Sequence, residues 1–209
     1  MGPEHTLLAL QPPDDPAILA RIGTAADLAA LYVGKLTAAR PRGPYFLGGY
    51  SAGALLALEM ARQLQAQGRE VALLVMLDPL FLRYSRLDQL FWRTLDRMVA
   101  MVAPFAGGRR IVRILSAMMQ DRGLQQHVRI LENHVPQPFG GRITLIEAQW
   151  SFLLRRPRFI AGWKRIAGGG LDRRFTKGTH HSFMRPPHVG ALGRQLGAWV
   201  AQRAGARDA

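Results

Sequence analysis

Apolar residues follow two different spacings along the chain, and the change between them separates short strands from longer helices. Five short runs are typical of strands, at 6–10, 45–50, 71–77, 142–149 and 171–176. Apolar residues three or four positions apart predict helices, at 24–40, 52–68 and 186–204. Because strands and helices alternate, the sequence predicts an α/β fold in which helices cover both faces of a mostly parallel sheet.

Residues at the ends of the predicted helices mark where these helices begin and stop. Thr24 stands before the helix at 24–40, and Asp27 follows three positions later, which is the pattern of a capping box. Gly68 stands where the helix at 52–68 stops, a position that favours glycine. The run at 71–77 is apolar throughout, as expected of a strand that is buried on both faces.

The middle of the chain, about 80–135, interrupts this alternation. It has helical apolar spacing and contains no convincing strand. We therefore expect a single domain over 1–209, with a helical insertion at about 80–135 that covers one edge of the sheet as a lid.

The composition indicates a globular protein and excludes several kinds of chemistry. The chain has 209 residues, 48% of them hydrophobic, which is enough for one sizeable core. It has no cysteine, so disulfides, thiol chemistry and cysteine-ligated metals are excluded. The longest apolar run is too short to span a bilayer, and no signal peptide is recognisable, so we expect a cytoplasmic protein without a membrane partner.

The chain carries a formal net charge of +14, almost all of it from arginine. The basic residues occur in pairs and short groups, such as 109–110, 155–158 and 173–174, and not in one run. Because no nucleic-acid-binding motif accompanies them, they predict a solvated basic surface and no nucleic-acid partner.

One motif carries candidate chemistry, the G-x-S-x-G pattern at Gly49–Gly53. In such a motif a serine lies on a sharp turn from a strand into a helix, and its hydroxyl projects above the sheet. Here the motif lies between the predicted strand at 45–50 and the predicted helix at 52–68, so Ser51 is a candidate nucleophile. The alternative is a glycine-rich turn with an inert serine.

A nucleophilic serine needs a histidine base and a carboxylate, and in a parallel sheet these gather at the carboxyl ends of the strands. Asp78 directly follows the strand at 71–77, and Glu147 near the end of 142–149 is the alternative acid. His180 and His181 both follow the last predicted strand. The order serine, acid, histidine is that of the α/β-hydrolases.

The segment "GPYFLGGYSAGALLALEMARQLQAQGREVALLVMLDP" resembles the thioesterase domain that ends non-ribosomal peptide synthetase and polyketide synthase assembly lines, an α/β-hydrolase family. "GRITLIEA" and "GTHHSFMRPPHV" resemble the second half of that domain. The resemblance favours Asp78 over Glu147, since the spacing from Ser51 and the "LD" at the strand end fit the acid of the family. It also favours His180 over His181, since the histidine directly after Gly-Thr is the one the family uses.

The resemblance implies a thioesterase that releases an acyl or peptidyl chain from the phosphopantetheine arm of a carrier protein, by hydrolysis or cyclisation. Ser51 would attack the thioester, His180 would take its proton, Asp78 would orient the imidazole, and the N–H of Ala52 would stabilise the oxyanion. No cofactor or metal is expected. The carrier protein is expected to be acidic, so the basic surface would help it to dock. Apolar side chains are expected to shape the acyl pocket, namely Tyr50, Phe81, Phe91, Trp92, Met98, Met101 and Phe105.

One departure from the family concerns the first residues of the chain. Family members begin with an earlier strand and a glycine-rich loop that supplies a second oxyanion donor, whereas "LLALQPPDDP" resembles a later point of the domain. We therefore expect this strand and this donor to be missing, which lowers turnover roughly 100- to 1000-fold. Three further hypotheses stay open: a stand-alone editing thioesterase, a general carboxylesterase, and a non-catalytic remnant that binds a carrier.

Overall fold

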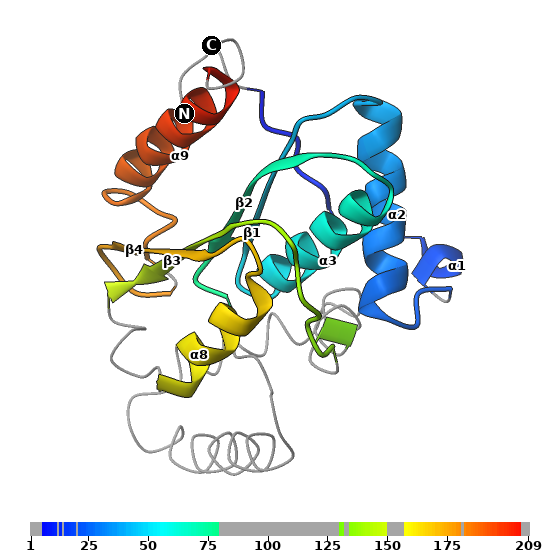
Figure 1. Ribbon diagram of the computed structural model, residues 1–209, viewed down its shortest axis with the longest axis horizontal. Helices are drawn as coiled ribbons and strands as arrows, with labels where there is room; N and C mark the ends of the chain where they lie inside the picture. The colour runs from blue at the N-terminus through cyan, green and yellow to red at the C-terminus, as the bar shows by residue number, and fades with distance from the viewer. Residues whose placement is uncertain are drawn as a thin grey trace.

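The structure of the chain is a computed structural model, and it describes residues 6–11, 13, 15–19, 21–79, 130–131, 134–149, 157–180 and 182–205. Four parallel strands form its sheet (Figure 1), namely β1 (Tyr45–Tyr50), β2 (Val71–Leu77), β3 (Ile143–Ala148) and β4 (Leu171–Thr176). Their order in the sheet is the order in the chain, β1-β2-β3-β4. Tyr50 pairs with Leu77, and Ala148 pairs with Thr176, so the carboxyl ends of the strands meet at one edge of the sheet.

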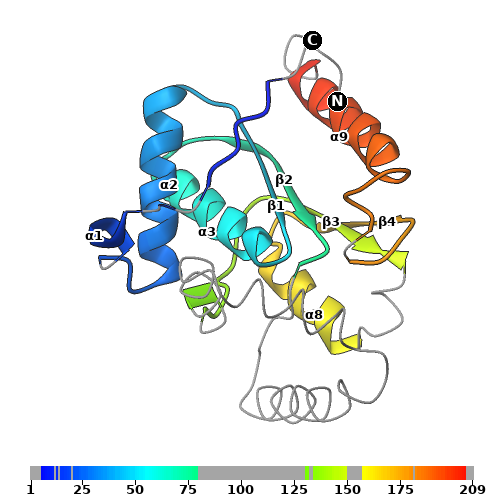
Figure 2. The same cartoon turned by 180° about the vertical axis from the view of Figure 1, so that it is seen from behind.

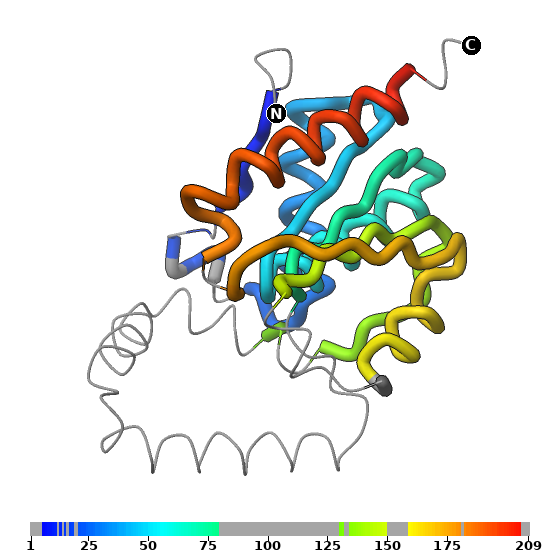
Figure 3. The backbone as a smooth tube through the Cα atoms, turned by 90° about the vertical axis from the view of Figure 1, so that its left-hand side faces the viewer, coloured from blue at the N-terminus to red at the C-terminus, as the bar shows by residue number. Residues whose placement is uncertain are grey.

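Helices cover both faces of this sheet, as the sequence predicts. The helices are α1 (Pro16–Leu19), α2 (Ala25–Ala39), α3 (Ala52–Ala66), α8 (Pro157–Ile166) and α9 (Val189–Gly205). Figure 1 and the reverse view in Figure 2 show α9 on one side of the sheet, with α2 and α3 on the other. In Figure 3 α9 crosses in front of the strands.

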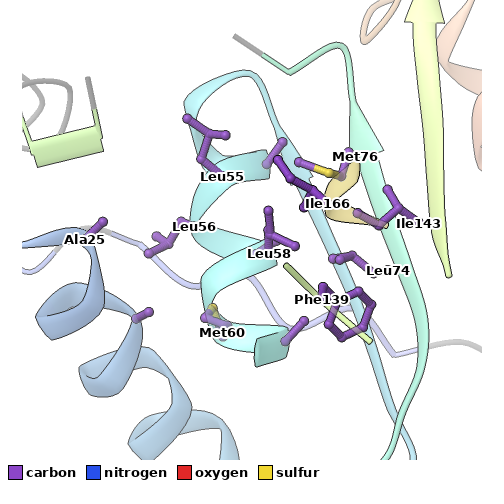
Figure 4. Packing of buried hydrophobic residues seen from close by; sticks show 14 of the residues in the cluster. Ala25, Leu55, Leu56, Leu58, Met60, Leu74, Met76, Phe139, Ile143 and Ile166 are labelled. Carbon is purple, nitrogen blue, oxygen red and sulfur yellow. The ribbon is translucent and has the colours of Figure 1, made fainter. Parts of the chain in front are cut away.

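The larger core lies between the sheet and helices α2, α3 and α8. Leu58 of α3 is fully buried against Leu74 of β2 and Phe139, as Figure 4 shows. Each such side chain contributes roughly 1.5–3 kcal/mol through burial. Because α3 begins at Ala52, inside the G-x-S-x-G motif, this packing holds the helical end of the motif onto the sheet.

The smaller core lies on the opposite face of the sheet. Alternate residues of β2 and β3, such as Val75 and Ile146, face Leu192 of α9 and the buried Phe183. A strand whose two sides are both buried is apolar throughout, which explains the uninterrupted run at 71–77. Phe183 lies three residues after His180, so this core also anchors the segment that carries the histidine.

Most of the predicted elements are confirmed: β1, β2 and β4 have the predicted bounds, and the ends of the other confirmed elements differ by at most three residues. The capping box of α2 is present, since Thr24 and Asp27 bond each other's backbone N–H groups. Gly68 follows α3 with a positive φ of 69°, as a helix stop favours. The prolines at 186–187 lie in turns before α9, which begins at Val189 and not at the prolines.

The predicted strand at 6–10 is wrong. This segment has no regular secondary structure, and Leu7 and Leu8 are 78% and 53% exposed. A strand needs a hydrogen-bonded neighbour as well as apolar residues, and residues 6–10 pair with none of the four described strands. The predicted insertion at about 80–135 lies almost entirely outside the described residues.

Candidate active site

Ser51 lies at the bend between β1 and α3. Its backbone has φ 56° and ψ −121°, a conformation that L residues rarely adopt, and its N–H donates a hydrogen bond to the Leu77 carbonyl at 2.9 Å. Gly49 permits the bend, because a Cβ at this position would overlap the carbonyl group of Gly53. At Gly53 itself a Cβ would have no described atom within 4 Å. The motif therefore has the strained backbone geometry expected of a nucleophile elbow, and Gly49 is the glycine that the turn requires.

The structure brings Ser51, Asp78 and His180 together in one hydrogen-bonded series. His180 Nε2 lies 3.0 Å from Ser51 Oγ, and His180 Nδ1 lies 2.7 Å from Asp78 Oδ2. The imidazole therefore bridges the hydroxyl and the carboxylate through its two nitrogens. This is the arrangement in which a histidine can take the proton of a serine while a carboxylate holds the other nitrogen protonated.

Hydrogen bonds with β3 hold both the backbone and the side chain of Asp78. The residue is fully buried, has a positive φ of 44°, and donates its N–H to the Ile146 carbonyl at 2.7 Å. The Ala148 N–H donates to Asp78 Oδ1 at 3.2 Å, which leaves Oδ2 directed at His180. Strand β3 thus orients the carboxylate that follows β2.

His180 follows β4, three strands away from β1, and its side chain is 26% exposed. Gly178 opens the connecting loop with φ 105°, where a Cβ would come within 2.7 Å of Ser182 Oγ. Thr179 and Ser182 bond each other's backbone N–H groups at 2.8 and 3.3 Å, on either side of the histidine. These contacts give the short loop a defined shape.

Tyr50, which the sequence predicts as a pocket residue, lies half-buried against His180. Its Oη donates to the His180 carbonyl at 2.7 Å, and the two rings stack with centroids 4.9 Å apart. Burial raises the pKa of the Tyr50 hydroxyl, and the negative charge of Asp78 raises it further. The phenol is therefore neutral at physiological pH and can act as a donor.

Ala52 is the first residue of α3, so its N–H has no acceptor within the helix. The partial positive charge of a helix N-terminus lies at the same place. A negatively charged oxygen that forms next to Ser51 would be stabilised by the Ala52 N–H and by the positive end of the helix dipole. The N-terminus of α3 can therefore supply one oxyanion donor.

The alternative acid, Glu147, does not contact His180 in any hydrogen bond that the structure records. It is fully buried and accepts two hydrogen bonds from Arg173 of β4, at 2.7 and 2.9 Å. Glu147 lies on β3 beside Ala148, whose backbone N–H, and not a side chain, reaches Asp78. The pair of Glu147 and Arg173 instead links β3 to β4.

Several predicted residues lie outside the described parts of the chain. They are His181 and the pocket residues Phe81, Phe91, Trp92, Met98, Met101 and Phe105. Within the described parts, no group of three or more His, Asp or Glu side chains is placed to hold a metal ion. No described helix is both long enough and apolar enough to cross a bilayer.

Sequence reasoning missed two of the contacts that shape the site. The N–H of Ala148 orients Asp78, and the Tyr50 side chain holds His180. A backbone donor leaves no trace in residue type, so the first had no signal. Tyr50 was predicted as a residue of the substrate pocket, and its contact with the histidine loop was not predicted.

Comparison with known proteins shows what this chain is similar to. The family model of the thioesterase domain matches residues 3–200. A non-reducing polyketide synthase of Cladonia metacorallifera is 28% identical in an alignment 219 positions long, and this alignment covers 84% of this chain but only 10% of that protein. A dimodular nonribosomal peptide synthase of Bacillus subtilis (strain 168) is 52% identical over 52 residues, 25% of this chain and 2% of that protein. The chain thus spans a tenth or less of these relatives.

A solved structure with the same fold is the NocB thioesterase domain from the nocardicin cluster. It is 26% identical, the alignment covers 88% of this chain and 79% of that chain, and the TM-score is 0.59.

Proposed function

The chain belongs to the thioesterase domain family, and from this membership we propose that it releases an acyl or peptidyl chain from the phosphopantetheine thioester of a carrier protein. One observation carries the proposal to particular atoms, the hydrogen-bonded series from Ser51 Oγ through His180 to Asp78. In this proposal Ser51 is the nucleophile, His180 the general base and Asp78 the group that orients it.

The first half of the reaction transfers the acyl group to Ser51. Ser51 Oγ bonds to the thioester carbonyl carbon while His180 Nε2 takes the hydroxyl proton, and Asp78 stabilises the resulting imidazolium. The Ala52 N–H stabilises the negative charge on the former carbonyl oxygen. When the carbon–sulfur bond breaks, the imidazolium returns its proton to the leaving thiolate, and an ester on Ser51 remains.

The second half releases the product from this ester. Water, or a nucleophile within the bound acyl chain, attacks the ester carbonyl while His180 removes its proton. The Ser51 oxygen then leaves and takes the proton back from His180. Water yields a free acid and an internal nucleophile yields a ring, and the described residues favour neither outcome.

A carrier-bound substrate is supported by the relatives, which are polyketide and peptide synthases. A large positive net charge supports an acidic carrier protein, because opposite charges steer two proteins together before they dock. Both points concern the substrate and partner of the proposed reaction, and neither affects the roles of Ser51, His180 and Asp78.

Labelling with a fluorophosphonate tests the proposed nucleophile. The folded chain should gain one phosphonyl group on Ser51, detected by intact mass and peptide mapping, whereas Ser51→Ala should gain none. The unlabelled chain should hydrolyse an acyl-pantetheine thioester, and labelling should abolish this activity.

Other outcomes separate the alternative functions. A folded chain that is not labelled at Ser51 contradicts the catalytic proposal and favours a carrier-binding remnant. Faster turnover of a simple oxygen ester than of the matching pantetheine thioester favours a carboxylesterase. A strong preference for acetyl over longer acyl groups on a carrier favours an editing thioesterase.

A further inference from the structure

The side chain of Tyr50 contacts the candidate base at two separate points. Its hydroxyl donates to the backbone carbonyl of His180 at 2.7 Å. Its ring stacks on the imidazole, with the centroids 4.9 Å apart and the planes 29° from parallel. The first contact holds the loop and the second limits the rotation of the imidazole, so one residue restrains both parts of His180.

The distance that the histidine loop must cross explains why such a restraint is needed. Ser51 follows β1, whereas His180 follows β4, which lies three strand spacings or roughly 14 Å away in the sheet. Only Lys177, Gly178 and Thr179 separate β4 from His180. Tyr50 belongs to β1, so its hydrogen bond ties the far end of this loop directly to the strand that carries the nucleophile.

The ring of Tyr50 is itself supported by the smaller core of the protein. Its ring meets Phe183 edge-on, with centroids 5.6 Å apart, and Phe183 is fully buried beneath α9. The ring therefore lies between the imidazole on one side and a fixed aromatic side chain on another. A side chain whose ring is already packed has little rotamer freedom left to lose when it restrains a neighbour.

Acylation of Ser51 changes which contacts still hold His180. Once Ser51 Oγ is esterified, it has no proton to donate to Nε2, so the bond between Ser51 and His180 is lost. The contacts of Tyr50 with His180 do not depend on that proton. During the release step, Tyr50 therefore still links the elbow to the base.

We propose that Tyr50 is a positioning residue, which acts through His180 and holds the imidazole between Ser51 and Asp78, most of all while Ser51 is acylated. The proposal rests on the proposed function of Ser51 and His180, but it assigns Tyr50 a role that differs from that of a substrate-pocket residue. A pocket residue would act on substrate binding, whereas a positioning residue acts on the rate of the bound complex.

Three variants test this role. Tyr50→Phe keeps the ring and removes the hydroxyl, and Tyr50→Leu removes both contacts. Tyr45→Phe is the matched control, because Tyr45 lies on the same strand and its hydroxyl also donates to a backbone carbonyl, that of Arg40 at 2.8 Å. Turnover of an acyl-pantetheine thioester, the rate of Ser51 labelling by a fluorophosphonate, and the melting temperature are measured for each.

Loss of one hydrogen bond should lower kcat of Tyr50→Phe by about 3- to 10-fold with KM within about twofold. Loss of the stacked ring as well should lower kcat of Tyr50→Leu by about 10- to 100-fold. The rates of Ser51 labelling should follow the same order, and Tyr45→Phe should match the wild type in every rate. In Tyr50→Phe the acyl-enzyme fraction at steady state, measured by intact mass, should rise above that of the wild type.

Equal kcat and equal acyl-enzyme fractions in Tyr50→Phe and Tyr45→Phe would overturn the proposal. A raised KM with unchanged kcat would also overturn it and assign Tyr50 to the substrate pocket. A wild-type chain that is not labelled at Ser51 instead rejects the proposed function, so the two failures are distinguishable. If Tyr50→Leu does not fold, Tyr50→Phe decides the question, because the ring still fills its site.

Discussion

Ser51 and Asp78 are the two non-glycine residues with positive φ among those described, at 56° and 44°. Such backbone conformations cost roughly 1–3 kcal/mol each, so the surrounding structure must impose them. Hydrogen bonds from their N–H groups to the Leu77 and Ile146 carbonyls fix each residue onto the neighbouring strand. The strain turns both side chains out of the sheet edge toward His180, where regular strand geometry would not place them.

The contacts of the two candidate carboxylates predict different consequences of their removal. Asp78→Asn should lower the rate of Ser51 labelling by roughly 1,000-fold or more, because an amide no longer holds His180 in the useful tautomer. Glu147→Gln should leave that rate within about threefold, because Glu147 bonds Arg173 and not His180. Its melting temperature should fall, since two charge-assisted hydrogen bonds lose their anion.

Both variants are to be compared by fluorophosphonate labelling and by thermal unfolding in the same buffer. A large loss of labelling in Glu147→Gln with normal stability would show that Glu147, and not Asp78, orients His180. Unchanged labelling in Asp78→Asn would have the same meaning.

At the scale of elements, the turn from β1 into α3 depends on one of its two motif glycines. Gly49→Ala places a methyl group against the Gly53 carbonyl and within 2.7 Å of the Ala54 Cα. Because backbone must move to make room, we expect a loss of roughly 1–3 kcal/mol in the free energy of unfolding and slower labelling of Ser51. Chemical denaturation and labelling rates measure the two effects.

Gly53→Ala is the matched control for this prediction. Its Cβ would meet no described atom within 4 Å, and alanine favours a helix more than glycine does. The free energy of unfolding should therefore stay within about 1 kcal/mol of the wild type. If Gly53→Ala is the more damaging of the two, the glycine that the turn requires has been assigned to the wrong position.

Helix α8 (Pro157–Ile166) was not predicted from the sequence. The helix begins at Pro157, whose fixed φ suits a first helical turn, and its fully buried Trp163 packs edge-on against Phe159. This proline was a usable signal of a helix start. The strand at 6–10 was wrongly predicted for a different reason. Its apolar pattern is that of a strand, but it pairs with none of the described strands.

At the scale of the whole molecule, the net charge of +14 predicts how a carrier protein would associate. Raising the salt concentration from roughly 0.05 to 0.5 M shortens the range of electrostatic attraction several-fold. If the carrier is acidic, as proposed, turnover of a carrier-bound acyl group should then fall by about 10-fold in kcat/KM, because electrostatic steering is lost. Turnover of the same acyl group on free pantetheine should change by less than about twofold.

The comparison of the two substrates serves as the internal control, since salt effects on the active site itself act on both. Carrier turnover that does not respond to salt would show that the basic surface takes no part in docking. The reaction at Ser51 would remain as proposed.

The sequence by itself determined the elements and the elbow, because both depend on local patterns. Apolar spacing defined α2, α3 and β1–β4, and Gly49 next to a strand end predicted the turn that presents Ser51. From the residues alone, Asp78 was the first candidate and Glu147 the alternative, and the family resemblance then favoured Asp78.

Tertiary structure decided the contacts between distant residues. Ser51 and His180 are 129 positions apart, and their 3.0 Å contact exists because four parallel strands end at one edge of a sheet. The same geometry brings three further pairs into hydrogen-bonding distance: Glu147 with Arg173, Asp78 with His180, and Tyr50 with the backbone of the histidine loop. Local patterns encode periodicity and turns, whereas these pairings depend on strand order and on which face each side chain occupies.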